Sequence, residues 1–183
     1  MVLSGRQPEI QGRIDIGLTG ELTMPIRCGF SLNDKETSQL WCSGFGAVVA
    51  YSGASRGRDN PRATATQNVG PLPAGTYYIV DRQSGGVLGW ARDLWSEYLW
   101  GTTNRTKWFA LWNPDTGDVT MINGVRRGTF RLHPEGPLRE SEGCIVVVSQ
   151  LDFDQLERFI RSGPPTVPIP GSTMRAYGTL EVR

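Results

Sequence analysis

Residues 107–148 decide the fold of this chain, and they read KWFALWNPDTGDVTMINGVRRGTFRLHPEGPLRESEGCIVVV. Their first part predicts three strands, because apolar and β-branched runs alternate with two turn sequences, NPDTGD and then Asn123-Gly124. The last of these strands is expected to end on His133. After the loop HPEGPLRESEG, the run GCIVVV predicts a continuous apolar strand that is buried on both faces.

Strands are also predicted on both sides of this stretch. The first forty residues alternate short apolar runs with glycines, which indicates a meander of two or three strands. A tight entry at Pro71, Pro73 and Gly75 precedes a β-branched and aromatic strand at 76–80. Residues 54–68 are polar and predict a loop, and residues 174–183 predict a closing strand.

Two helices are expected outside the sheet. The first is indicated by apolar side chains at three- and four-residue steps, namely Leu88, Ala91, Trp95 and Leu99. The second follows an N-cap at Ser149, is expected to end near Gly163, and has an apolar face made of Leu151, Leu156, Phe159 and Ile160. We therefore expect one domain over residues 1–183, mainly β, as a sandwich or barrel with about two peripheral helices.

Charge and hydropathy argue against several classes of function. Lys and Arg total 19 against 18 Asp and Glu, so the net charge of +1 provides no long-range field that would attract nucleic acid or an anionic membrane. No apolar stretch is long enough to span a membrane. The N-terminal residues MVLSGRQPEIQGRID lack the basic start and apolar run of a signal peptide, so the general secretory route is not expected.

The three cysteines are Cys28, Cys42 and Cys144, too few for a disulfide scaffold and without the C-x-x-C spacing of a metal site. Either Cys28 and Cys42 form one bridge, which leaves Cys144 as the odd thiol, or all three are small buried apolar residues. One histidine and scattered cysteines do not supply the three or four ligands that zinc needs.

The single histidine, His133, lies eleven positions before Cys144. A thiol is activated when a neighbouring imidazole takes its proton, and histidine suits this because its pKa is near neutrality. The loop between them is short enough to return on itself if the two flanking strands are neighbours. Gly143 permits close approach to a substrate, its N–H and that of Cys144 are candidate oxyanion donors, and Ser141 can orient the turn.

Three other interpretations are open. A buried cysteine at the start of a core strand often serves packing alone, and a single histidine is often a satisfied core or surface group. A noncatalytic wall-binding or carbohydrate-binding module is the alternative function, because aromatic side chains gather in one region, at Trp90, Trp95, Trp100, Trp108 and Trp112. A different cysteine hydrolase, such as an amidase, usually has the cysteine before the histidine in the chain.

The spacing His133-x(7)-Ser141-x-Gly143-Cys144, followed by an apolar strand, resembles the active-site signature of the L,D-transpeptidase catalytic domain. Further segments are similar to the branch of that superfamily that type VI secretion delivers as antibacterial effectors. They are AYSG at 50–53, Asn60-Pro61, NVGPLPAGTYYIVD at 68–81 and FRLH at 130–133. The resemblance covers about residues 45–150, and the ordered combination is more specific than any one segment.

The resemblance implies an L,D-transpeptidase-like fold and a role for each matching residue. Cys144 would be the nucleophile and His133 the general base, with Ser141 and Gly143 shaping the oxyanion turn. The cleft and the substrate contacts would include Arg131, Ser52, Gly53 and Asn60. The alternatives for these four are a surface arginine and ordinary turn chemistry. Two departures are Pro134, where many relatives have glycine, and Ile145, where arginine is frequent.

The implied reaction is cleavage of the bond between the diamino acid and D-alanine of a stem tetrapeptide, through a thioester on Cys144 and without metal or cofactor. Water would resolve the thioester as an L,D-carboxypeptidase does, and a D-amino acid would resolve it by exchange. The implied partners are peptidoglycan stem peptides, the secretion machinery and a periplasmic immunity protein. The implied location is the target-cell periplasm, after synthesis in the cytoplasm without a signal peptide.

Overall fold

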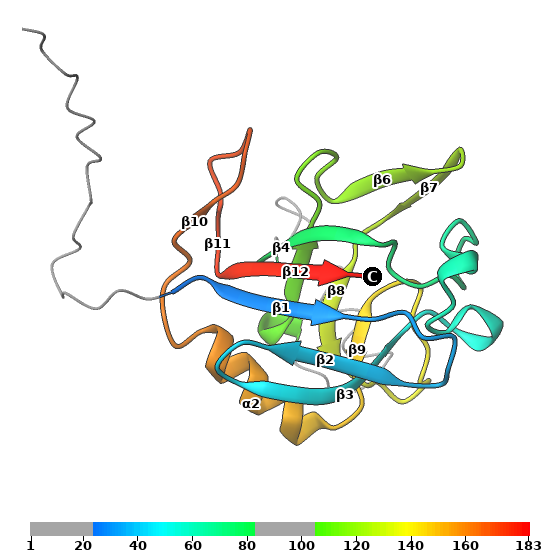
Figure 1. Cartoon of the computed structure of the whole chain (residues 1–183), viewed down its shortest axis with the longest axis horizontal. Helices are drawn as coiled ribbons and strands as arrows, with labels where there is room; N and C mark the ends of the chain where they lie inside the picture. The colour runs from blue at the N-terminus through cyan, green and yellow to red at the C-terminus, as the bar shows by residue number, and fades with distance from the viewer. Residues whose placement is uncertain (1–23, 83–104) are drawn as a thin grey trace, which may run out of the picture.

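The computed structural model describes residues 24–82 and 105–183. Within these two ranges, eight strands close into a barrel in the order β1-β12-β4-β5-β8-β9-β3-β2 (Figure 1). The neighbours β1 and β12 are parallel, as are β8 and β9, and the other pairs are antiparallel. The expected mainly β fold is confirmed, and of the two architectures considered it is a barrel.

The elements have the following bounds. The barrel strands are β1 Ile26–Phe30, β2 Ser38–Cys42, β3 Gly46–Ser52, β4 Gly75–Asp81, β5 Phe109–Trp112, β8 Arg131–Pro134, β9 Ile145–Val147 and β12 Gly178–Val182. Two small sheets are made by β6 Val119–Ile122 with β7 Val125–Gly128, and by β10 Val167–Pro168 with β11 Arg175–Ala176. The helices are α2 Gln150–Ile160 and the 3-10 turns η1 Ser55–Gly57, η2 Pro61–Ala63 and η3 Arg105–Lys107.

Residues 107–133 form four strands where the sequence predicted three. Thr129 has φ +55°, a left-handed conformation that ends β7 before β8 begins. The hairpin predicted at Asn123-Gly124 is present, with Ile122 paired to Val125, but it makes a separate sheet instead of a part of the barrel. The β6–β7 hairpin therefore projects from the barrel wall (Figure 1).

The barrel interior is the main apolar core. Alternate residues of each strand point inward, as expected for the period-two geometry of a strand. The fully buried ones include Phe30, Leu40, Ala50, Ile79, Leu111, Leu132, Ile145 and Leu180. Cys28 and Cys42 lie directly opposite one another on β1 and β2 and form a disulfide, so the first of the two cysteine alternatives holds.

Helix α2 starts as predicted, with the Asp152 N–H donating to the N-cap Ser149 Oγ at 3.2 Å. Its buried side chains are Phe153, Leu156 and Ile160. Leu151 was expected on this apolar face and is instead 63% exposed, because two residues of helix place it on the side opposite Phe153. The predicted helix at residues 88–99 lies outside the described residues.

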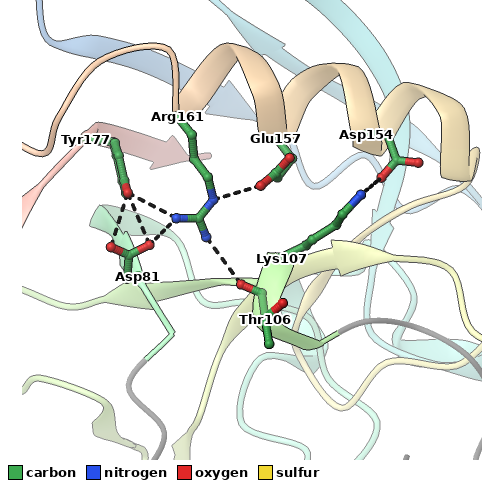
Figure 2. Close-up of polar contacts among 7 residues, drawn as sticks. All are labelled: Asp81, Thr106, Lys107, Asp154, Glu157, Arg161 and Tyr177. Carbon is green, nitrogen blue, oxygen red and sulfur yellow. Dashed lines mark hydrogen bonds and ion pairs between the residues drawn. The ribbon is translucent and has the colours of Figure 1, made fainter.

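Ion pairs hold α2 against the barrel (Figure 2). At its C-terminal end Arg161 pairs with Asp81 of β4 and, at 2.8 Å, with Glu157, and it donates to the Tyr177 hydroxyl at 3.1 Å. One turn from its start, Asp154 accepts from Lys107 of η3 at 2.8 Å. No helix in residues 24–82 and 105–183 is long and apolar enough to cross a membrane.

Candidate functional site

His133 and Cys144 come from neighbouring strands of the barrel wall. In the parallel pair β8–β9, Leu132 lies opposite Ile145 and His133 opposite Val146, and Cys144 immediately precedes β9. Leu132 and Ile145 point into the core, so the alternation of side chains puts His133 and Cys144 together on the outer face. In this structure no hydrogen bond joins the side chains of His133 and Cys144.

The imidazole of His133 is held from two sides. Its Nδ1 lies 2.8 Å from the carbonyl oxygen of Pro134, and since a carbonyl only accepts, Nδ1 carries the proton and Nε2 remains an acceptor. Its ring stacks on Trp108 with centroids 4.3 Å apart and planes at 20°. Burial lowers the pKa of His133 to about 4, assisted by the charge of Arg105 and opposed by the Pro134 carbonyl. His133 is therefore neutral at neutral pH.

Cys144 is the free thiol of the described chain and is half-buried. Its Sγ lies 3.9 Å from the carbonyl oxygen of Thr129. Burial raises the pKa of Cys144 to about 11, while the N–H and the charge of Arg131 act to lower it and Glu142 and Asp118 act to raise it. At rest the thiol and the imidazole are thus both neutral, so any proton transfer between them must accompany attack on a substrate.

The turn that leads into Cys144 is built by Ser141 and Gly143, both buried. Ser141 Oγ donates to the Cys144 carbonyl at 2.7 Å and accepts from the Gly143 N–H at 3.2 Å. Gly143 has φ +116°, and a Cβ there would lie 2.6 Å from Nη2 of Arg127, so only glycine fits. The structure brings Ser141 and Gly143 into contact with Cys144, but the Gly143 N–H is engaged within the turn.

Ser52 supports this turn from inside the protein. It is fully buried at the end of β3, and its Oγ donates to the Gly143 carbonyl at 3.2 Å and accepts from the Leu72 N–H at 2.7 Å. Its own N–H donates to Asp59 Oδ1 at 2.8 Å. Burial raises the pKa of Asp59 to about 7. Ser52 therefore contacts the cysteine turn through the interior and not through the cavity described below.

Gly53 and Asn60 lie in the loop that follows β3. Gly53 has φ +86°, and a Cβ there would lie 2.6 Å from the Gly57 carbonyl oxygen. The Asn60 side chain caps η2 by accepting from the Arg62 N–H at 3.0 Å and donates to the Arg56 carbonyl at 3.2 Å. These contacts are the turn chemistry considered for both residues, and neither lines the cavity at the thiol. A contact with substrate stays a prediction.

Arg131 lies on the same strand face as His133, as its spacing predicted. Its guanidinium is bidentate to Asp118, with Nη1 to Oδ1 at 2.6 Å and Nη2 to Oδ2 at 2.9 Å, and its side chain is 12% exposed. The fork that would bind a substrate carboxylate is therefore already paired in this structure. The substrate-binding role of Arg131 stays a prediction.

A cavity of about 230 Å³ opens at the thiol. Its walls come from the 67–68 loop, the β6–β7 hairpin and the turn before Cys144, and its lining residues are Gln67, Asn68, Val119, Arg126, Arg127, Gly128, Thr129, Glu142 and Cys144. Arg126 is exposed and Arg127 is 4% exposed. Within the described ranges, no group of three or more His, Cys, Asp and Glu side chains is arranged to hold a metal ion.

Sequence reasoning missed Arg127 and the role of Trp108. Both residues lie in predicted strands, so the sequence predicted their secondary structure. The neighbouring residues do not indicate that Arg127 reaches the 64–71 loop or that Trp108 stacks on His133. Trp112 packs against a second apolar cluster, as expected for a core tryptophan. Trp90, Trp95 and Trp100 lie outside the described residues.

A closed β-barrel with a free cysteine and a neutral histidine on one outer face, beside a polar cavity, defines a protein with a candidate cysteine-nucleophile site. The family model of the Tlde1 domain matches residues 46–172, more than half of the chain. The chain therefore belongs to the Tlde1 family of type VI secretion effectors. Searches of curated proteins and of solved structures gave no match.

Proposed function

We propose that this chain is an antibacterial, peptidoglycan-modifying cysteine enzyme that removes or exchanges the terminal D-alanine of stem tetrapeptides. Its membership of an effector family supports a toxic role. The observation that carries the proposal is that Cys144 lines a cavity of about 230 Å³ and that His133 lies on the same outer face of the β8–β9 pair. A neutral imidazole with Nε2 as acceptor is the form that a general base requires.

In the proposed reaction, Cys144 Sγ attacks the carbonyl carbon between the diamino acid and D-alanine while His133 Nε2 takes the thiol proton. Transfer of that proton alone is unfavourable, because the thiol pKa is about 11 and the imidazole pKa about 4. Bond formation to carbon must therefore accompany it. The imidazolium then protonates the departing amine of D-alanine, which leaves a thioester on Cys144.

Two acceptors can resolve the thioester. Water gives the tripeptide acid and the free thiol, which is the L,D-carboxypeptidase outcome, and the amine of another D-amino acid gives the exchanged tetrapeptide. In both cases His133 removes a proton from the acceptor and returns it to sulfur. The Cys144 N–H is the donor that we assign to the oxyanion, because the Gly143 N–H donates to Ser141.

Arg126 is the residue that we assign to the carboxylate of the terminal D-alanine. It is exposed, it lines the cavity at the thiol, and it forms no ion pair within residues 24–82 and 105–183. Arg131, the arginine that the sequence suggested, is bidentate to Asp118. An Arg126→Ala variant should therefore raise KM more than it lowers kcat.

The test uses disaccharide tetrapeptide with and without D-methionine, with product masses read for the wild type and for Cys144→Ala. Loss of D-alanine, or its replacement by D-methionine, with the wild type alone supports the proposal and identifies the dominant branch. If the tetrapeptide returns unchanged while the folded wild type binds sacculi, the wall-binding alternative replaces the enzyme.

The effector family implies a secretion machinery, and the proposed substrate implies action in the periplasm of the target cell. A producing cell would need a cognate immunity protein there. We expect that protein to cover the cavity at Cys144, so that Arg126→Glu weakens its capture in a pull-down. Undiminished capture by that variant would place the immunity contact elsewhere.

A further inference from the structure

Arg127 of β7 is a buried cation whose hydrogen bonds join two loops. Within residues 24–82 and 105–183, its side chain donates only to main-chain carbonyl oxygens, namely those of Thr64, Gly70 at 2.8 Å, Pro71 at 3.5 Å and Glu142 at 3.1 Å. Glu142 is the second residue before the proposed nucleophile, whereas the other three acceptors belong to the 64–71 loop. The guanidinium therefore ties that loop to the turn that presents Cys144.

The charge of Arg127 is not neutralised by a carboxylate among the described residues. None of the ion pairs in residues 24–82 and 105–183 includes it, although its side chain is only 4% exposed. Burial lowers the pKa of this guanidinium, and the ionised forms of Tyr77, Glu142 and Cys144 act to raise it. A buried charge without a counter-ion is unfavourable, so an apolar residue would be better here if only packing mattered.

The guanidinium lies against the turn of the nucleophile. Its Nη2 is the atom that a Cβ on Gly143 would meet at 2.6 Å, and Arg127 and Cys144 line the same cavity. We propose that Arg127 is a positioning residue for Cys144: its hydrogen bonds hold the turn, and its uncompensated positive charge stabilises the thiolate. This inference rests on the proposed role of Cys144 as nucleophile.

The other charged side chains near the thiol differ from Arg127 in pairing or in exposure. The charge of Arg131 also lowers the pKa of the thiol, but its guanidinium is paired in a bidentate manner with Asp118, whose charge acts to raise that pKa. Glu142 has an exposed side chain and opposes ionisation of the thiol. Arg126 also lines the cavity and forms no ion pair within the described ranges, but its side chain is exposed, so solvent screens its charge. Arg127 is the buried cation at the cysteine turn that has no anionic partner within residues 24–82 and 105–183.

The test measures the rate at which iodoacetamide alkylates Cys144 from pH 6 to pH 11, followed by intact mass. Cys28 and Cys42 are bridged, and Cys144→Ser provides the blank. The matched variants are Arg127→Gln, which keeps hydrogen-bond donors but loses the charge, and Arg127→Lys, which keeps the charge. We expect the Gln variant to react about tenfold more slowly at pH 8, and the Lys variant to follow the wild type.

Equal profiles for the wild type and the Gln variant would overturn the proposal, as would equal slowing in the Gln and Lys variants. If both variants fail to fold, Arg127 is needed for the stability of the fold, and this result would also count against the proposed positioning role. Alkylation requires no substrate. An expected alkylation result without tetrapeptide turnover by the wild type would therefore refute the proposed function and leave the assignment of Arg127 in place.

Discussion

Removal of the Cys28–Cys42 bridge should cost about 3 kcal/mol of stability. The two cysteines are 14 positions apart in sequence, and the entropy of closing a loop of that size in the unfolded chain corresponds to about 3 kcal/mol. For a chain of this length each kcal/mol moves Tm by about 2–4 °C, so we expect a decrease of roughly 6–12 °C. The value is an upper estimate, because any β1–β2 contact that the unfolded chain retains already brings the two residues together.

The assay is calorimetry of the wild type and of Cys28→Ala/Cys42→Ala, both carrying Cys144→Ala to prevent thiol exchange. Alanine is preferred to serine because both positions are 3% exposed and a hydroxyl there would be buried. A reductant should lower Tm of the bridged protein and leave the double variant unchanged. A Tm difference below about 2 °C, or three reactive thiols in unreduced, denatured wild type, would refute the reasoning. Such a bridge is expected to persist in an oxidising compartment such as the periplasm.

Three further predictions concern the ionisable side chains Asp59, His133 and Arg161. Folding raises the pKa of the Asp59 carboxyl to about 7, so the folded state is penalised as the pH rises and this group ionises. Between pH 4 and pH 8 the free energy of unfolding in urea should fall by up to about 4 kcal/mol more for the wild type than for Asp59→Asn. A difference between the two proteins that does not change with pH would contradict this. The single histidine should titrate near pH 4 by NMR, and Trp108→Leu should raise that midpoint by admitting water; an unchanged midpoint would exclude the stack as a cause. In thermal melts, Arg161→Met should lower the free energy of unfolding by about 2 kcal/mol, whereas the exposed control Arg183→Met should change it little. Equal losses in the two variants would show that the network of Figure 2 stabilises the fold no more than an exposed ion pair does.

Local sequence patterns predicted much of the fold. The β4 strand, the Asn123-Gly124 hairpin, the apolar strand after Cys144 and the Ser149 cap are all present, because each depends on neighbours within a few residues. The separate β6–β7 sheet was not predicted. A left-handed Thr129 has no composition signal comparable to that of glycine, so the break between β7 and β8 could not be read.

The candidate site was predicted in part. The chemistry of a thiol and an imidazole, and the turn made by Ser141 and Gly143, follow from residue type and short spacing. The pairing state of Arg131 did not follow, because Asp118 lies thirteen positions away and its approach depends on how the hairpin folds back. The contact of Ser52 with the Gly143 carbonyl spans 91 positions and was equally unreadable.

By itself, the sequence determined that this is a mainly β chain whose one histidine lies eleven positions before a cysteine that leads into an apolar strand. Those properties are carried by turn residues, alternation and spacing, which act over a few positions. Only the tertiary structure decided that β8 pairs with β9 and that Trp108 stacks on the imidazole of His133. It also decided that the Arg127 guanidinium donates to the Glu142 carbonyl in the turn before Cys144. Burial and electrostatics set both pKa values, and these depend on which distant segments the closed barrel brings together.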